Sequence, residues 1–280
     1  MKYLWANALL SLTGSASAIF TGHKLFDFRN LANPRVPDAL PDWNSNKAAR
    51  ETHEYFLSRE FTDPFAIMEW SKNVTPSVPI RMTNSFNNIY IQPNTDPNPE
   101  SSTFMTMRTV RHPDFQSAAE LQTKTADYQH VAMTMRARTI GGPGAVTAMF
   151  TYRMPEGGSW EDVQEADLEI RTAEPRNEVR YTNQPSYDPV RDEERPDAFR
   201  DVTLPTVWTT WQTHRMEWTP GKVDWYVNGQ FMTSISYQAP VDPAYLIWNV
   251  WSDGGVWSGE MPVYEHVEMH IQYIEIEYLG

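Results

Sequence analysis

Short segments of alternating apolar and polar residues recur along the chain. Val131, Met133 and Met135 alternate with polar residues, and the segment 222–227 follows the same pattern. Because neighbouring side chains of a strand point to opposite faces, this alternation predicts half-buried strands. A helical period of 3.6 residues is hardly sustained anywhere, and we expect only a short helix around residues 47–57. The pattern therefore predicts a nearly all-β protein.

Turn signals divide the chain into many short strands. Thr219-Pro220-Gly221 and Asn228-Gly229 are typical hairpin turns. Many antiparallel strands joined by such turns favour an all-β fold, a two-sheet antiparallel β-jelly-roll sandwich. The expected strands are Ile89–Gln92, Thr103–Arg111, His130–Thr139, Ala145–Arg153, Glu165–Arg171, Glu178–Thr182, Trp211–Thr219, Lys222–Val227, Phe231–Tyr237, Tyr245–Trp251 and His266–Tyr278.

Two long segments rich in Pro and Asp, Pro93–Ser102 and Gln184–Pro205, separate some of these strands. Loops of this length inside a domain are more often functional than incidental. We expect both to be loops, with the second near a functional site.

The first eighteen residues resemble a signal peptide. Lys2 gives a positive start, residues 4–12 an apolar run, and Ala16-Ser17-Ala18 a cleavage site. The apolar run is too short to span a bilayer. We therefore expect a signal peptide at residues 1–18, one β-jelly-roll domain at residues 19–280, and secretion to the extracellular space.

Composition excludes several kinds of function. The chain has no Cys, which rules out disulfides, thiolate metal sites and a cysteine nucleophile. Its net charge of −13 argues against nucleic acid or an anionic membrane as a partner. Its 11 Trp and 13 Tyr suit a neutral sugar, whose apolar faces stack on aromatic rings. We expect a monomer that binds a polysaccharide.

The segment 165–169 carries the most informative chemistry. Glu165, Asp167 and Glu169 alternate with Ala166 and Leu168, so all three acids share one face of a strand. Crowded carboxylates drive their pKa values apart, so that one ionises while another keeps a proton. Retaining glycoside hydrolysis needs such a pair, roughly 5–5.5 Å apart. The row also fits a solvated strand in a chain with 36 Asp and Glu.

Further motifs follow in an order that resembles glycoside hydrolase family 16, the concanavalin-A-like endo-β-glucanases and transglycosylases. The resemblance covers roughly residues 130–278 and rests on the Glu-x-Asp-x-Glu row itself and on motifs around it. These motifs are Phe150-Thr151-Tyr152, Tyr181-Thr182-Asn183, His214 with Trp218 and Pro220, the hairpin Val223–Gly229, and Trp248-Asn249-Val250-Trp251.

The resemblance implies a role for each acid. Glu165 would attack the anomeric carbon, Glu169 would act as the general acid and base, and Asp167 would tune both pKa values. It also implies a set of sugar-binding residues. These are Trp251, Asn249, Tyr181, Asn183 and Trp160.

Several positions depart from the family pattern. Gln164 and Ala166 flank the first Glu where many members have an Asp and a large aliphatic residue. Many members hold a structural calcium with an Asp of the last strand, where this chain has Gln272. We therefore expect no cofactor, and a structural calcium finds little support. The absence of a bulge residue before the last Glu is typical of lichenases, xyloglucan-active enzymes and fungal cell-wall transglycosylases. The segment Asp253–Gly259 resembles secreted fungal members.

Two groups of histidines are rival candidate sites. His214 shares a strand face with apolar neighbours and is expected to be a buried structural residue. His266, Glu268 and His270 share one strand face, but their spacing is not that of a helical zinc peptidase. We expect no metal site there.

These observations predict a secreted retaining endo-β-glucanase that cleaves β-1,3 or mixed β-1,3/1,4 glucan by double displacement. A transglycosylase using the same site is the first alternative. A carbohydrate-binding lectin is the second, although a lectin has no need of a row of like charges. A structural jelly roll without sugar binding is the remaining alternative.

Overall fold

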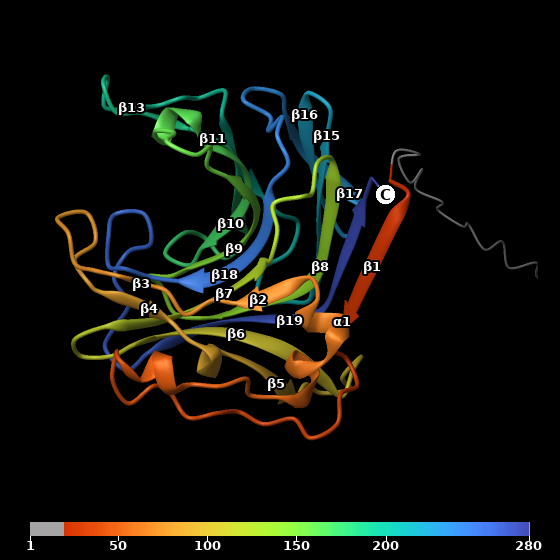
Figure 1. The fold of residues 1–280 in the computed structure, drawn as a ribbon, viewed down its shortest axis with the longest axis vertical. Coiled ribbons are helices and arrows are strands. Elements are labelled where there is room, and N and C mark those ends of the chain that lie inside the picture. Colours follow the sequence, from red (N-terminus) through yellow and green to blue (C-terminus); the bar gives the residue numbers. More distant parts are fainter. Residues whose placement is uncertain (1–19, 280) are drawn as a thin grey trace, which may run out of the picture.

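The computed structural model describes residues 20–279, and the signal peptide expected at residues 1–18 lies outside them. Two mostly antiparallel sheets pack face to face, and strand β7 (Gln116–Thr123) pairs with strands of both (Figure 1). No helix in residues 20–279 has the length and apolar character that crossing a membrane requires.

Sheet A contains the chain's last strand near its centre. β19 (His266–Tyr278) pairs along one edge with β8 and along the other with β6 and then β1. Its other strands are β1 (Gly22–Asp27), β3 (Ser71–Lys72), β4 (Met82–Asn84), β5 (Ile89–Pro93), β6 (Thr103–Arg111), β8 (Val131–Gly141), β15 (Gln212–Thr219), β16 (Lys222–Val227) and β17 (Gln230–Ile235).

Sheet B carries the row of carboxylates. Its strands lie in the order β2 (Phe65–Ile67), β7, β18 (Tyr245–Trp251), β9 (Val146–Arg153), β10 (Gln164–Arg171), β11 (Glu178–Gln184) and β14 (Phe199–Thr203). In Figure 1 this sheet curves, and its concave face is turned away from sheet A. The remaining elements are the hairpin β12 (Tyr187–Asp188) and β13 (Glu193–Glu194), helix α1 (Arg59–Thr62), and the 3-10 turns η1 (Ser45–Ala48), η2 (Glu54–Leu57), η3 (Phe86–Asn88) and η4 (Trp160–Asp162).

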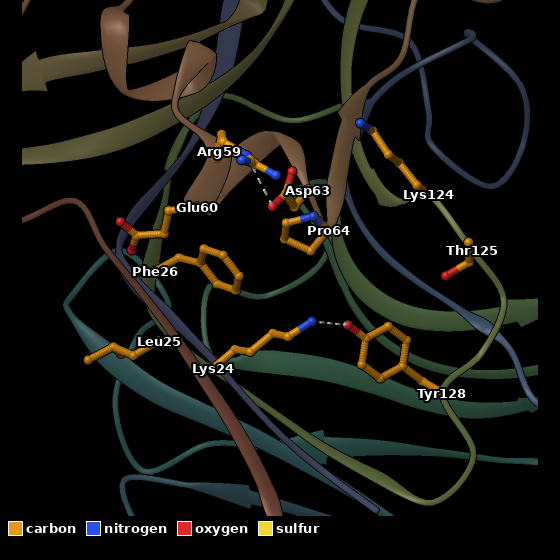
Figure 2. Close-up of a pocket in the computed structure, with 10 residues that line it drawn as sticks. All are labelled: Lys24, Leu25, Phe26, Arg59, Glu60, Asp63, Pro64, Lys124, Thr125 and Tyr128. Carbon is orange, nitrogen blue, oxygen red and sulfur yellow. Dashed lines mark hydrogen bonds and ion pairs between the residues drawn. The ribbon is translucent and has the colours of Figure 1, made fainter. Parts of the chain in front are cut away.

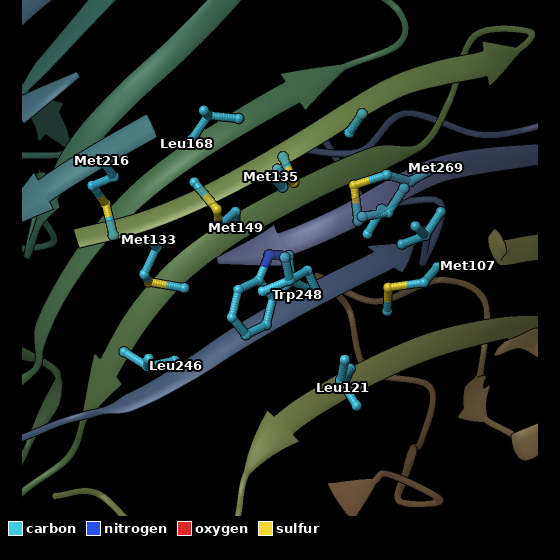
Figure 3. Close-up of a cluster of buried hydrophobic side chains, with 14 of the residues drawn as sticks. Met107, Leu121, Met133, Met135, Met149, Leu168, Met216, Leu246, Trp248 and Met269 are labelled. Atoms are coloured by element: carbon cyan, nitrogen blue, oxygen red, sulfur yellow. The ribbon is translucent and has the colours of Figure 1, made fainter. Parts of the chain in front are cut away.

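The core lies between the two sheets and is rich in methionine. Leu168 and Trp248 from sheet B meet Met133, Met216 and other apolar side chains from sheet A (Figure 3). Each fully buried apolar side chain of this size contributes about 1.5–3 kcal/mol. Flexible methionines fill the irregular gaps left between two twisted sheets. This packing fixes which face of each strand points outward.

The structure confirms the two-sheet jelly roll and the expected strands, with small shifts at their ends. The helix expected around residues 47–57 is wrong, because only the short turns η1 and η2 form there. The segment 184–205 is not one loop, because it contains β12, β13 and β14. The sequence pattern also missed β7, whose buried residues include Gln116, Ser117 and Glu120 and therefore do not alternate in polarity.

Candidate active site

The three carboxylates of β10 project from the concave face of sheet B. The residues between them, Ala166 and Leu168, are fully buried in the core, which forces Glu165, Asp167 and Glu169 to the opposite face. Asp167 is buried, whereas the two glutamates are only partly covered. The row expected from the sequence therefore occupies the face that a long ligand can reach.

Asp167 is held by a neighbour on β11. The Gln184 amide Nε2–H donates to Asp167 Oδ2 at 3.2 Å, and Gln184 Oε1 accepts from the backbone N–H of Ser186 at 2.8 Å. The pKa of Asp167 lies well above its usual value, because the group is buried and faces the charges of Glu165 and Glu169. Burial, these charges and the hydrogen bond with Glu165 all favour the protonated form of Asp167.

Glu165 has neighbours that act on its pKa in opposite directions. Its pKa is raised to about 7, mainly by burial and also by the charge of Glu169, while the hydrogen bond from Asp167 acts in the opposite direction. Tyr152 lies opposite Glu165 on β9, and burial followed by the charge of Glu165 raises the pKa of its phenol. A carboxyl group in this setting titrates around neutral pH, and its ionised form is poorly solvated, which suits a nucleophile.

Glu169 has a different environment, with two cations and an indole beside it. The Trp257 indole N–H donates to Glu169 Oε1 at 3.1 Å. Burial raises the pKa of Glu169, whereas the hydrogen bond from Trp257 and the charges of Arg171 and Arg180 lower it. The net effect is a raised pKa, as a general acid requires.

The carboxylates titrate as one unit, because each changes the charge that its neighbours experience. Three negative charges on this face are strongly unfavourable, so the row keeps at least one proton near neutral pH. The environments of the two glutamates differ: Glu165 has the hydrogen bond from Asp167, whereas Glu169 has the indole of Trp257 and the charges of Arg171 and Arg180. Two carboxyl groups in different environments are what glycosyl transfer needs to divide the work between a nucleophile and an acid.

Two of the expected sugar-binding residues share this face. Asn249 and Trp251 lie on β18, two strands away from the carboxylates. Asn249 donates to Glu120 of β7, whose other bond comes from the Trp70 indole at 2.8 Å. The side-chain oxygen of Asn249 has no partner within residues 20–279. Lys72 lies 5.7 Å from the centre of the Trp251 ring.

Tyr181 and Asn183 do not line this face, so the expectation for these two residues is corrected. On β11 they lie opposite Leu168 and Ala166 of β10, whose side chains point into the core. Tyr181 packs against Trp225 with ring centres 5.2 Å apart. The amide of Asn183 donates to two backbone carbonyls of the segment 235–237. The residues of β11 that reach the concave face are the alternate ones, Arg180, Thr182 and Gln184.

Trp160 lies in η4, in the loop that leads into β10, and its side chain is 45% exposed. The next residue, Glu161, forms an ion pair with Arg195 at 2.7 Å and so joins this loop to the segment after β13. The indole of Trp160 is therefore accessible, and its role in stacking on a sugar stays a prediction.

The position aligned with the family's calcium ligand does not suit a cation. Gln272 is buried, and its side-chain oxygen accepts a hydrogen bond from Arg136 Nε at 2.9 Å. A guanidinium on the side-chain oxygen of Gln272 repels Ca²⁺, and the backbone oxygen of Gln272 already accepts from the N–H of Phe28 at 2.9 Å. The residues present therefore do not fit a calcium site.

The histidines have structural surroundings. Burial lowers the pKa of His214 to about 4, so this residue is neutral in the core. His270 Nε2 contacts Glu268 at 2.8 Å, and Arg138 Nε donates to its other ring nitrogen at 3.1 Å. Glu268 also accepts from Tyr90. Across residues 20–279, no group of three or more His, Asp or Glu residues is arranged to hold a metal ion.

Sequence reasoning missed Glu120, Gln184 and Trp257 as members of the site. Glu120 and Gln184 lie in segments without any motif that marks them. Trp257 lies within the segment Asp253–Gly259, whose sequence resembles fungal members but does not mark any residue of the site. A separate pocket of about 520 Å³ lies between β1 and α1 and includes Lys24 and Tyr128, but none of the carboxylates of β10 (Figure 2).

Comparison with known proteins gives bacterial relatives. The chain is 25% identical over 148 residues to the β-glucanase of Bacillus amyloliquefaciens, covering 50% of this chain and 58% of that protein. It is also 25% identical to the β-glucanase of Bacillus subtilis, covering 50% and 57%. The chain thus spans a little more than half the length of these relatives. They give no support to the expected likeness to fungal members.

Solved structures share the fold. The β-glucanase of Bacillus licheniformis matches with a TM-score of 0.60 at 18% identity, covering 77% of this chain and 92% of that one. A prokaryotic β-1,3-1,4-glucanase (lichenase) from a mouse hindgut metagenome matches with a TM-score of 0.61 at 13% identity, covering 93% and 100%. The sequence model described as "Glycosyl hydrolases family 16" matches residues 82–275. With most of the chain matched and the carboxylate row in place, the protein belongs to glycosyl hydrolase family 16.

Proposed function

We propose that the protein is a retaining endo-β-glucanase that cleaves β-1,3 or mixed β-1,3/1,4 glucan. The observation that carries this proposal is the row Glu165, Asp167 and Glu169 on the concave face of sheet B, where the pKa of each carboxyl group is raised and each glutamate has different neighbours. The Bacillus relatives named β-glucanase and the structure named lichenase support glucan as the substrate.

The first chemical step uses both glutamates. Glu165 attacks the anomeric carbon while Glu169 gives its proton to the glycosidic oxygen, and the electrons of the breaking C–O bond go to that oxygen. The hydrogen bond from Asp167 keeps Glu165 ionised until it attacks. The glycosyl unit is then bound covalently to Glu165, and the shortened chain leaves.

The second step releases the sugar. Glu169, now ionised, removes a proton from water as the water oxygen attacks the anomeric carbon, and the bond to Glu165 breaks. Two inversions restore the original β configuration. We expect Trp251 and the pair Asn249–Glu120 to bind sugars further along sheet B, because they lie on the neighbouring strands β18 and β7. We expect Trp160 to stack on a sugar, because its side chain is exposed.

Secretion is part of the same proposal. A polymeric glucan does not enter a cell intact, and the segment 1–18 has the three parts of a signal peptide. Protein purified from culture medium should begin at Ile19; full-length protein confined to the cytoplasm would contradict secretion.

The test is reducing-end release and product sizing on laminarin, barley β-glucan, lichenan, xyloglucan and agarose. We expect shorter oligosaccharides from the glucans, and losses of about 10³-fold or more in Glu165→Gln and Glu169→Ala. Added azide should restore turnover of an activated aryl glycoside by Glu169→Ala and give a β-glycosyl azide.

Other outcomes would decide against the proposal. Products longer than the substrate would identify a transglycosylase. Binding of polysaccharide with no product from any substrate would identify a lectin. Activity within tenfold of the wild type in either glutamate variant would remove these residues from the chemistry.

A further inference from the structure

Trp257 reaches Glu169 from outside sheet B. It lies in the segment 252–265, which joins β18 to β19, whereas Glu169 lies on β10. Its indole N–H donates to Glu169 Oε1 at 3.1 Å. The cross-strand neighbours of Glu169 are Ala148, which has no polar side chain, and Arg180, which is charged. The indole is therefore a neutral hydrogen-bond donor that reaches this carboxyl group from outside the sheet.

Two guanidinium groups fix the indole ring. Arg171 lies 4.6 Å and Arg180 lies 5.1 Å from the centre of the Trp257 ring. Arg180 also lies 3.7 Å from the ring centre of Phe199 and forms an ion pair with Glu194 at 2.5 Å. Such contacts between cations and aromatic faces strengthen when they are shielded from water. Arg171 lies on β10, as Glu169 does, and Arg180 lies on the adjacent strand β11. These two arginines therefore hold the indole ring close to Glu169.

The backbone around Trp257 is also constrained. Gly254 has a φ of +72°, and a side chain there would meet Ile80 at 2.5 Å. Asp253 accepts from Lys72 at 3.0 Å and from Ser258 at 3.3 Å. These contacts restrict the backbone on both sides of Trp257, so its indole N–H points in one direction.

The chemistry of the two groups assigns the proton of the acid. An indole N–H only donates, so Glu169 Oε1 must accept. In a neutral carboxyl group the carbonyl oxygen is a much stronger acceptor than the hydroxyl oxygen, so the hydrogen bond favours the hydroxyl at Oε2. Without Trp257, the proton is free to occupy either oxygen and the carboxyl group is free to rotate.

We propose that Trp257 is the positioning residue of the general acid: it orients Glu169 so that the acidic proton lies on Oε2 and faces the glycosidic oxygen. The inference rests on the proposed function, because it assumes that Glu169 protonates the leaving group. Trp257 acts through Glu169 and need not touch the sugar.

The effect on pH dependence follows from the charges around Glu169. Arg171 and Arg180 favour its ionised form, and Asp167 and Glu165 face it on the same strand. The indole hydrogen bond also favours the ionised form. Removing it raises the pKa of Glu169, so the alkaline limb of the kcat profile should move to higher pH while the acidic limb stays in place.

The experiment compares Trp257→Phe with wild type on two substrates: a glucan oligosaccharide, and the aryl glycoside of the same sugar with a 2,4-dinitrophenol leaving group. The activated phenol leaves with little help from an acid. We expect kcat on the oligosaccharide to fall about tenfold or more, as part of the 10²–10⁴-fold contribution of general acid catalysis, and the rate of the first step on the activated substrate, measured as the initial burst of dinitrophenol, to fall less than threefold. Trp43→Phe is the matched control, because Trp43 also lies beneath an arginine, 4.5 Å from Arg81, and should change neither value.

Both values come from the same preparation, so their ratio does not depend on the folded fraction. Equal losses on the two substrates, or a change confined to KM, would overturn the inference and assign Trp257 to packing or sugar stacking. An unmoved alkaline limb would overturn it as well. Failure of the proposed function has a different signature, because Glu169→Ala would then keep its activity on the oligosaccharide.

Discussion

Burial makes the charge on Glu165 unfavourable, and the resulting loss of stability depends on pH. Its pKa rises from 4.5 to about 7 in the folded protein. A carboxyl group with a raised folded pKa stabilises the fold fully below its unfolded pKa, and this stabilisation is lost as the pH rises through the folded value. The loss falls between about pH 4.5 and 7.

Glu165→Gln should therefore raise the free energy of unfolding at pH 8 by about 1–3 kcal/mol relative to wild type, with little difference at pH 4.5. Urea unfolding at both pH values measures this. The gain in stability should accompany the loss of turnover, since the same buried charge supplies both. If the free energies of unfolding of wild type and Glu165→Gln differ by the same amount at every pH, the pKa of Glu165 does not change on folding.

Individual residues differ in how far the sequence predicts them. The face of Glu165, Asp167 and Glu169 follows from alternation with two apolar residues, so the sequence predicts it correctly. The link between Trp257 and Glu169 joins residues 88 positions apart, and no local pattern carries it. Gln184 is likewise assigned only by the pairing of β11 with β10.

At the scale of elements, the register of β11 decides which residues meet a substrate. The motif Tyr181-Thr182-Asn183 suggests a subsite, but its faces depend on how β11 pairs with β10. A shift of one residue exchanges the core face for the open face. The sequence marks the strand but contains nothing that fixes this register. By contrast, the hairpin of β15 and β16 is predicted by its own turn residues, Thr219-Pro220-Gly221.

Tyr181→Phe tests this register. The hydroxyl of Tyr181 is buried in the core without a partner within residues 20–279. Removing such a group is neutral or stabilising, by up to about 1 kcal/mol. We expect the melting temperature to stay or rise slightly and KM for glucan to stay within twofold. A severalfold rise in KM with unchanged stability would place Tyr181 among the sugar-binding residues instead.

At the scale of the molecule, the amino-terminal segment is part of the sandwich. The family match begins at residue 82, yet β1 pairs with the second half of β19, the last strand. Phe26 of β1 packs against Phe65 of β2 with ring centres 4.7 Å apart, which joins the edge of sheet A to the edge of sheet B. The sequence did not predict β1 or β2, because both are short and their partners lie far along the chain.

Phe26→Ala and Leu25→Ala compare the two faces of β1. Phe26 is 2% exposed and Leu25 is 42% exposed. Loss of the buried ring should lower the free energy of unfolding by about 3–5 kcal/mol, whereas the exposed leucine should change it by about 0.5 kcal/mol or less. At roughly 2–4 °C for each kcal/mol, Phe26→Ala should melt roughly 6–20 °C below wild type. Because Phe26 also braces β2, and β2 pairs with the strand that carries Glu120, the loosened edge should weaken binding of long glucans more than of short ones. Equal melting temperatures for the two variants would show that β1 is dispensable to the sandwich.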